Sequence, residues 1–461
     1  MKIKLFNAEK ELRKIQRNNM PMIVAGIVLS VLVLTLIIYQ SYAIFRVSDK
    51  HNITNSQVGE FSNDPCPSCG TLKVANTTDF LNAFAYAELP IFWEIVFTDT
   101  NVAPSSGVLG PFDVSEAGDG SVMAWREVSS LNPGYLVFKI TIGSDGGVKA
   151  NPNSSNLFAG LPLVKLDLTH FYTHTATNME RMFYKTRLNV FSLDLGPNFD
   201  TSNVTNMKEM FNDTGRQNTT FKLDLGDNFD TSSVTNMQGM FWQTGHESTA
   251  FTLDLGDKFN TSNVTNMSSM FANIGYNNPN FTLNLGDKFD TSSVTNMQRM
   301  FWQTGIKSSN FQLDLGDNFD TSSVTNMREM FSSIGSTNTT FRLDLGPNFD
   351  TSNVVDMAGM FYSAGYESKL FTINLGDKFF TTNVTDMTST FYGVGNANNS
   401  FVLDIRTLEF EKNPVKTQML KALNTRAKIY VKNAAAKSFV SPGTVLETNV
   451  TVIDCSSNAC P

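Results

Sequence analysis

A 30-residue period dominates this chain between residues 199 and 379. One phrase fills each period, as in FDTSNVTNMKEMFNDTGRQNTTFKLDLGDN. A period of this length is typical of a solenoid, in which each unit buries its apolar face only against its neighbours. The repetition therefore favours an elongated recognition or structural surface over an enzyme pocket. The phrase begins at Phe199, Phe229, Phe259, Phe289, Phe319, Phe349 and Phe379, and a looser copy begins 28 residues before the first, at Phe171.

Each repeat predicts one strand and one short helix. Residues 221–225 (FKLDL) alternate between apolar and polar side chains, which is the pattern of a half-buried strand. Val234, Met237 and Phe241 then follow at spacings of three and four, one face of a short helix, and Gly245 ends it. The predicted fold is an α/β, leucine-rich-repeat-like solenoid with 30-residue repeats. A parallel strand stack lies on one side and the short helices lie on the other.

Two polar columns run through the repeats. A polar residue inside an apolar pattern is costly unless its hydrogen bonds are met, so the amide column is predicted to satisfy turn backbone groups as scaffold. The strand column is acidic, and we expect either a solvated face offset by backbone donors or, as the sharper alternative, calcium. The amide column is Asn178, Asn206, Asn236, Asn266, Asn296, Asn326, Asp356 and Asp386; the acidic column is Asp194, Asp224, Asp254, Asn284, Asp314, Asp344, Asn374 and Asp404.

The N-terminus predicts a membrane anchor. Residues 22–39 form an uncharged apolar run of 18 residues, close to the roughly 20 that a helix needs to cross a bilayer. Residues 1–20 carry a net charge of +4, which marks the cytoplasmic side. The alternative is a cleaved signal peptide, because residues 41–43 (SYA) resemble a small-x-small site. The preferred prediction is a single-pass membrane protein with its C-terminal body extracellular.

Four cysteines lie in two close pairs, Cys66 with Cys69 and Cys455 with Cys460. The two pairs bracket the repeat array, so a zinc site that joins all four is disfavoured. The Cys66–Cys69 spacing also matches a redox motif, but the βαβ context of that motif is lacking. Two local disulfides in an oxidising space are the preferred interpretation.

The surroundings of the repeats predict caps, because an open solenoid end exposes apolar core. Residues 413–423 have helical spacing, residues 427–431 predict a final strand, and residues 433–440 predict a short helix. The predicted organisation is a cytoplasmic basic segment (1–20), a transmembrane helix (21–45), an extracellular stalk (46–75), an N-terminal cap region (76–160), the repeat solenoid (161–405), and a C-terminal cap and tail (406–461).

The segment after each Met-Phe pair is the variable part of the repeat. It presents aromatic side chains among Asn, Ser and Gly, a composition that suits protein or glycan recognition. The alternative is that these rings only cover the adjacent turn. The candidate ligand-binding residues are Trp242, Tyr276, Trp302, Tyr362 and Tyr366.

The phrase FDTSNVTNM-x-x-MF followed by F-x-LDLG closely resembles the BspA-type leucine-rich-repeat proteins of bacterial surfaces, a group that includes the mycoplasma-type surface repeat. The resemblance covers about Tyr135 to Val440. One departure is the longer insert after Met-Phe, where the family typically has a shorter, Cys-containing turn. The resemblance implies a solenoid fold and adhesion to host or partner macromolecules, with no catalytic residues to transfer.

Other functions are disfavoured. The net charge of −8 leaves −12 on the chain after residue 20, which argues against nucleic acid as a partner. His170 and His174 lack the Glu of a metalloprotease motif, and no nucleophile–His–acid set stands out. We therefore expect no catalytic residues, no metal and no cofactor. The predicted function is adhesion to extracellular proteins or glycans, and the alternative is a structural or self-associating surface protein.

Overall fold

The computed structural model describes residues 64–73, 92–129, 137–188, 192–286, 288–316, 318–443, 445–446, 450–457 and 460. The chain divides after Asn63, and all these residues lie in the second unit, Asp64–Pro461. The predicted basic segment (1–20), transmembrane helix (21–45) and most of the stalk (46–75) lie outside the described residues. Within the described part, no helix has the length and apolar character needed to cross a bilayer.

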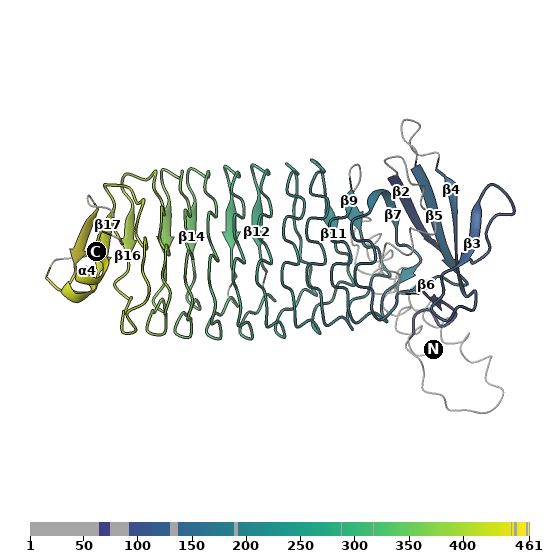
Figure 1. Cartoon of the computed structure of the whole chain (residues 1–461), viewed down its shortest axis with the longest axis horizontal. Coiled ribbons are helices and arrows are strands. Elements are labelled where there is room, and N and C mark those ends of the chain that lie inside the picture. The colour runs from purple at the N-terminus through teal and green to yellow at the C-terminus, as the bar shows by residue number, and fades with distance from the viewer. Residues whose placement is uncertain are drawn as a thin grey trace, which may run out of the picture. The chain divides into compact units, whose positions relative to one another are not determined.

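Short strands joined by turns make up most of the second unit (Figure 1). The single helix among the described residues is α4 (Ala434–Val440), whose first turn is capped by the side chain of Asn433. The strands are β1 (Gly70–Thr71), β2 (Phe92–Thr98), β3 (Leu109–Asp113), β4 (Val122–Val128), β5 (Val137–Ser144), β6 (Val148–Lys149), β7 (Pro162–Asp167), β8 (Phe171–Tyr172), β9 (Arg187–Leu188), β10 (Leu193–Asp194), β11 (Leu223–Asp224), β12 (Thr282–Asn284), β13 (Gln312–Asp314), β14 (Arg342–Asp344), β15 (Thr372–Asn374), β16 (Val402–Asp404), β17 (Lys428–Val431) and β18 (Thr451–Asp454).

A six-stranded sheet precedes the repeats, in the order β3-β4-β5-β2-β7-β9. Strands β2, β5, β7 and β9 run parallel, and β4 pairs antiparallel with both β3 and β5. The inward side chains of this sheet, such as Ile95 and Ile140, belong to the same buried cluster as the core of the repeats. The described part of the predicted N-terminal cap region (76–160) is therefore packed onto the first coils.

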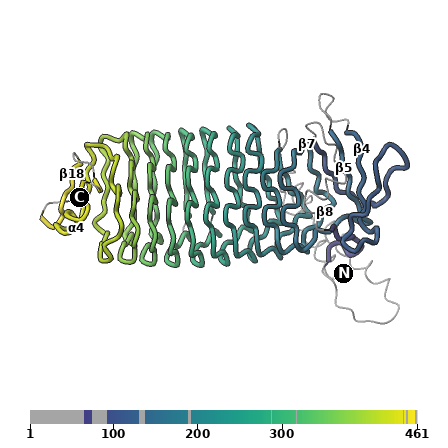
Figure 2. The backbone as a smooth tube through the Cα atoms, viewed as in Figure 1, coloured from purple at the N-terminus to yellow at the C-terminus, as the bar shows by residue number. Residues whose placement is uncertain are grey.

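The repeats form coils that lie side by side in a row (Figure 2). On one side, strands of successive repeats pair in parallel with a shift of one repeat, as in Leu193 with Leu223 and Leu283 with Leu313. On another side, the amide column forms a continuous series of parallel bridges from Asn153 to Val415. Successive coils are therefore joined by backbone hydrogen bonds on two sides.

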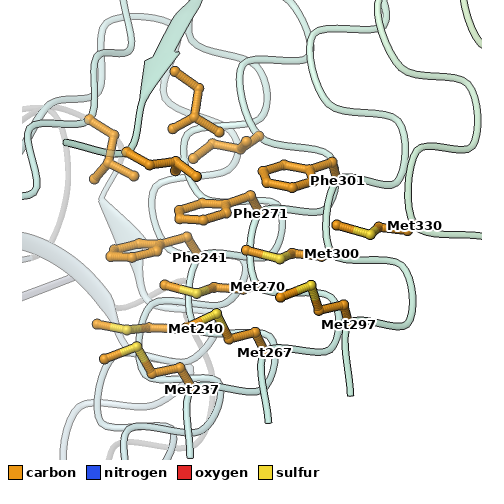
Figure 3. Close-up of a cluster of buried hydrophobic side chains, with 14 of the residues drawn as sticks. Met237, Met240, Phe241, Met267, Met270, Phe271, Met297, Met300, Phe301 and Met330 are labelled. Atoms are coloured by element: carbon orange, nitrogen blue, oxygen red, sulfur yellow. The ribbon is translucent and has the colours of Figure 1, made fainter. Parts of the chain in front are cut away.

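The core of the coils consists of repeated columns of Phe and Met (Figure 3). Phe241, Phe271 and Phe301 stack with centroids 5.8 Å apart at each step, and all three are fully buried. Met240 and Met270 lie in a row that runs parallel to these rings, and Met237 and Met267 lie in a second row (Figure 3). The apolar positions that the sequence pattern selected are thus the positions that face inward.

The predicted short helices of the repeats are wrong. Residues 237–244 instead form consecutive turns, with positive φ at Gly239 (60°) and Gln243 (58°). The N–H groups of Gly239 and Gln243 donate to the next coil, at 2.8 and 2.9 Å, whereas a helix would direct them to its own preceding turn. The N–H groups of Trp242 and Thr244 close the turns within the coil.

The spacing of the coils explains why a helix is absent. Helices that lie side by side need about 8–10 Å between their axes. Here the coils are hydrogen-bonded to each other on the turn side as well as on the strand side, and hydrogen-bonded strands lie only about 4.8 Å apart. A turn segment that gives its N–H groups to the next coil fits this spacing, and its inward residues keep the three-and-four pattern that also marks a helix face.

The C-terminal end combines correct and wrong predictions. The predicted strand at 427–431 corresponds to β17, but it is not the final strand because β18 follows it; the predicted helix at 433–440 corresponds to α4. Residues 413–423 contain no helix, contrary to their helical spacing, because they form one more coil: the N–H of Val415 donates to Thr385 of the preceding coil at 2.9 Å. Strands β17 and β18 extend the parallel pairing that begins at β16.

Candidate binding surface

The five candidate aromatic residues fall into two neighbouring columns on the turn side of the coils. We call the position after each Met-Phe pair the outer column, and the position after the glycine of the same turn the glycine column. The N–H of Gln303 donates to the carbonyl of Ser332 at 2.8 Å, and that of Ser333 donates to Tyr362 at 2.6 Å, so column neighbours lie on adjacent coils. The outer column is Asn212, Trp242, Ala272, Trp302, Ser332, Tyr362 and Tyr392; the glycine column is Arg216, His246, Tyr276, Ile306, Ser336, Tyr366 and Asn396.

Large and small side chains alternate along most of the outer column. Ala272 and Ser332 are buried, with 1% and 4% of their surface exposed, whereas Trp302 between them is partly exposed. Tyr362 is 39% exposed. Where two rings are adjacent, as in Tyr362 and Tyr392, they stack with centroids 4.8 Å apart and planes within 5°. The rings of Tyr362 and Tyr392 therefore face along the row of coils.

Tyr276 is held by packing rather than open to a ligand. The ring of His246 stacks on it at 4.2 Å from the preceding coil, and the Lys307 ammonium lies 4.8 Å from its centroid on the following coil. Burial, together with the positive charges of Arg216 and Lys307, lowers the pKa of His246 to about 4. His246 is therefore neutral at pH 7 and acts as an apolar stacking partner.

A groove opens between Trp302 and Tyr362. Its volume is about 420 Å³, and Ser332 and Ser333 of the intervening coil line it. Arg328 also lines the groove. This volume falls within the range of small-molecule sites. Two of the predicted aromatic residues are thus brought together, although 60 residues separate them in the chain.

The charged and small residues of this groove were not predicted from the sequence. The Arg299 guanidinium pairs with Glu329 at 2.7 Å, and Arg328 lies 3.7 Å from the same carboxylate. Arg328 also lies 3.5 Å from Asp356. The signal available in the sequence was a small residue, Ser332, between two aromatic ones at repeat spacing, a pattern that Ala272 between Trp242 and Trp302 shares.

The acidic column on the strand side has a structural role in the turns. Each of its side chains accepts a hydrogen bond from the backbone N–H two residues later, as Asp224 does from Gly226 at 3.0 Å and Asp314 does from Gly316 at 3.0 Å. Backbone donors therefore offset the row of carboxylates. Across the described residues, no group of three or more His, Cys, Asp or Glu side chains is arranged to hold a metal ion.

The cysteines and His174 also have structural partners. Cys66 is disulfide-bonded to Cys69, and Cys455 is bonded to Cys460. Nε2 of His174 lies 3.1 Å from a carboxylate oxygen of Asp64, close to the first disulfide in the sequence.

Coils of about 30 residues, joined by parallel backbone pairing on two sides, define a mixed α/β repeat protein made mostly of short strands and turns. A family model described as "Mycoplasma protein of unknown function, DUF285" matches residues 152–284 and 272–404, together more than half of the chain. The chain belongs to this family. Neither the curated proteins nor the solved structures include a match to it.

Proposed function

We propose that this chain is a cell-surface protein, anchored by one N-terminal membrane helix, whose turn side binds extracellular proteins or glycans without catalysing a reaction. The observation that carries the proposal is the groove between Trp302 and Tyr362, where partly exposed rings stand beside polar side chains. Half-exposed aromatic residues with polar neighbours are the usual anchors of recognition surfaces. We further propose kinship with the BspA-type leucine-rich-repeat surface proteins.

Two other features support an extracellular location. Disulfides persist in oxidising spaces, and each cysteine pair is bonded locally. The coils also expose a polar surface with few charges, since charged residues are only 17% of the chain. Such a surface is suited to hydrogen-bonded contacts with other macromolecules.

Location is tested by labelling intact cells with a membrane-impermeant, amine-reactive biotin reagent. Lys222, Lys258 and Lys288 are exposed on successive coils, so mass spectrometry can read the labelling of the repeats directly. We expect these lysines to be labelled on intact cells as fully as in lysed cells. Labelling that requires lysis would place the repeats inside the cell and end the proposal.

Binding is tested with the full-length chain in mild detergent on arrays of extracellular-matrix proteins and glycans. Trp242→Ala combined with Trp302→Ala should weaken binding. The strand-side pair Lys222→Ala with Thr252→Ala is the matched control and should not. Identical binding by both double variants would exclude the aromatic surface, and binding of nothing but other copies of the chain would favour a self-associating structural protein.

A further inference from the structure

The gap between the Trp302 and Tyr362 side chains has the width of a single ring-shaped guest. Adjacent rings in the outer column stack 4.8 Å apart, as Tyr362 and Tyr392 do. Trp302 and Tyr362 stand two coils apart, which corresponds to about 10 Å for strands spaced about 4.8 Å. One ring-shaped group therefore fits between the side chains of Trp302 and Tyr362, in the place that an aromatic side chain at position 332 would take.

Two guanidinium groups face three carboxylates in and beside the groove. Glu329 is paired with Arg299 at 2.7 Å, and Arg328 lies within 4 Å of Glu329, Asp356 and Asp386. This surplus of one carboxylate repels an anionic guest. The electrostatics therefore favour an uncharged ligand over an anionic one.

The rest of the groove is polar. Ser333 lines it from the intervening coil, beside Ser332, which is only 4% exposed, and Thr388 and Ser389 line it from the coil after Tyr362. Hydroxyl groups both donate and accept hydrogen bonds. A Phe side chain of a partner protein would cover these groups without pairing them, and the single O–H of Tyr or N–H of Trp would leave most of them unpaired, which costs free energy. A ligand with apolar faces and a hydroxylated edge can stack on the rings of Trp302 and Tyr362 and form hydrogen bonds with the polar groups.

We propose that this groove binds one uncharged pyranose ring of a glycan, with the faces of the sugar against Trp302 and Tyr362 and its hydroxyl groups against the serine and threonine side chains. The inference rests on the proposed function and narrows it from proteins or glycans to neutral sugars. It also assigns the specificity to two coils rather than to the whole aromatic surface.

The test uses the full-length chain in detergent on a glycan array with neutral hexose and N-acetylhexosamine termini, beside sialylated and sulfated ones. Ser332→Tyr is the decisive variant, because it fills the groove with a ring of the kind already stacked at Tyr362 and Tyr392 and removes no wall. We expect neutral glycans to bind, Ser332→Tyr to weaken their binding about tenfold or more, and the Tm to be unchanged or higher. Trp302→Ala, which removes a wall, should weaken binding to a similar degree.

Lys222→Ala is the control, since Lys222 is exposed on the strand side and does not line the groove. Its binding to neutral glycans should equal that of the unmodified chain. Full binding by Ser332→Tyr, equal loss in Lys222→Ala, or binding confined to charged glycans would overturn the inference. A chain that binds array proteins but no neutral glycan would also overturn it while leaving the proposed function intact, whereas a chain that binds neither would refute both.

Discussion

The rings of Phe241 and Phe271 stack with centroids 5.8 Å apart and planes only 5° apart. They occupy equivalent positions in successive repeats, and both are fully buried. A single Phe therefore contacts its counterparts in the coil before and the coil after. This relationship is repeated along the row, so each coil supplies half of the packing surface of its neighbours.

Removing one ring from the middle of this row should strongly destabilise the fold. Phe271→Ala removes contacts with both Phe241 and Phe301, and the backbone ladders on two sides prevent the coils from collapsing into the cavity. We expect the free energy of unfolding in urea to fall by about 3–5 kcal/mol. Leu370→Ala, at a residue that is 64% exposed, is the control and should change it by less than about 0.5 kcal/mol. Comparable losses in the two variants would contradict the ring-stacked core.

Each position of the amide column should require a hydrogen-bond acceptor, which a carboxylate can supply as well as an amide. Oδ1 of Asn266 accepts a 3.0 Å hydrogen bond from the N–H of Ser268, and Asp356 makes the same contact with Ala358 at 2.9 Å. Asn266→Ala leaves this N–H unpaired and should destabilise the fold by about 1–2 kcal/mol. Asn266→Asp keeps the acceptor, so its thermal midpoint at pH 7 should stay close to that of the unmodified chain. Equal midpoints for the Ala and Asp variants would show that the hydrogen bond contributes nothing.

Substituting two glycines of one repeat separates the cost of backbone strain from the cost of steric crowding. Gly245 and Gly256 both have positive φ, at 56° and 72°. A Cβ on Gly245 would lie 2.8 Å from the Phe251 ring, whereas a Cβ on Gly256 would meet nothing within 4 Å. Gly256→Ala should therefore cost only the left-handed strain of about 1–2 kcal/mol. Gly245→Ala should cost about 1–3 kcal/mol more, because it also overpacks the core. Chemical denaturation of both variants measures the difference, and equal costs would show that the ring simply moves aside.

The sequence was sufficient to predict which residues face inward, but not the backbone that carries them. The spacing of Val234, Met237 and Phe241 is shared by a helix face and by consecutive turns, and all three are fully buried. What distinguishes the two is the direction of the N–H groups of Gly239 and Gln243, which donate to the next coil. That direction depends on the distance between coils, which a single repeat does not encode.

The candidate binding surface could also be predicted only in part from the sequence. Aromatic residues after each Met-Phe pair were visible in the sequence, but their partners come from neighbouring coils. Tyr276 is flanked by His246 and Lys307, so it packs, whereas Trp302 and Tyr362 frame a groove because Ser332 stands between them. Distinguishing these cases requires the knowledge that equivalent positions lie side by side.

His246 should make the fold less stable as the pH falls. Its pKa is lowered to about 4 in the folded chain, against about 6.5 when unfolded, chiefly because it is half buried beside Tyr276 and faces the charges of Arg216 and Lys307. Between these two values the unfolded chain binds the proton and the folded chain does not. Stability is therefore complete above pH 6.5 and is lost progressively as the pH falls toward 4.

The measurement is the free energy of unfolding of the chain and of His246→Gln at pH 7 and at pH 4.5. A shift of this size corresponds to about 3 kcal/mol in full, and partial exposure of the ring reduces the expected effect to about 1 kcal/mol. The unmodified chain should lose about that much more than His246→Gln between the two pH values. The raised pKa of the nearby Asp213, which burial causes, acts in the opposite direction but is common to both proteins and cancels in the difference. If the difference in free energy of unfolding between the two proteins stays constant with pH, His246 is protonated as easily in the folded chain as in the unfolded one. Its stacking on Tyr276 would then not prevent it from becoming charged.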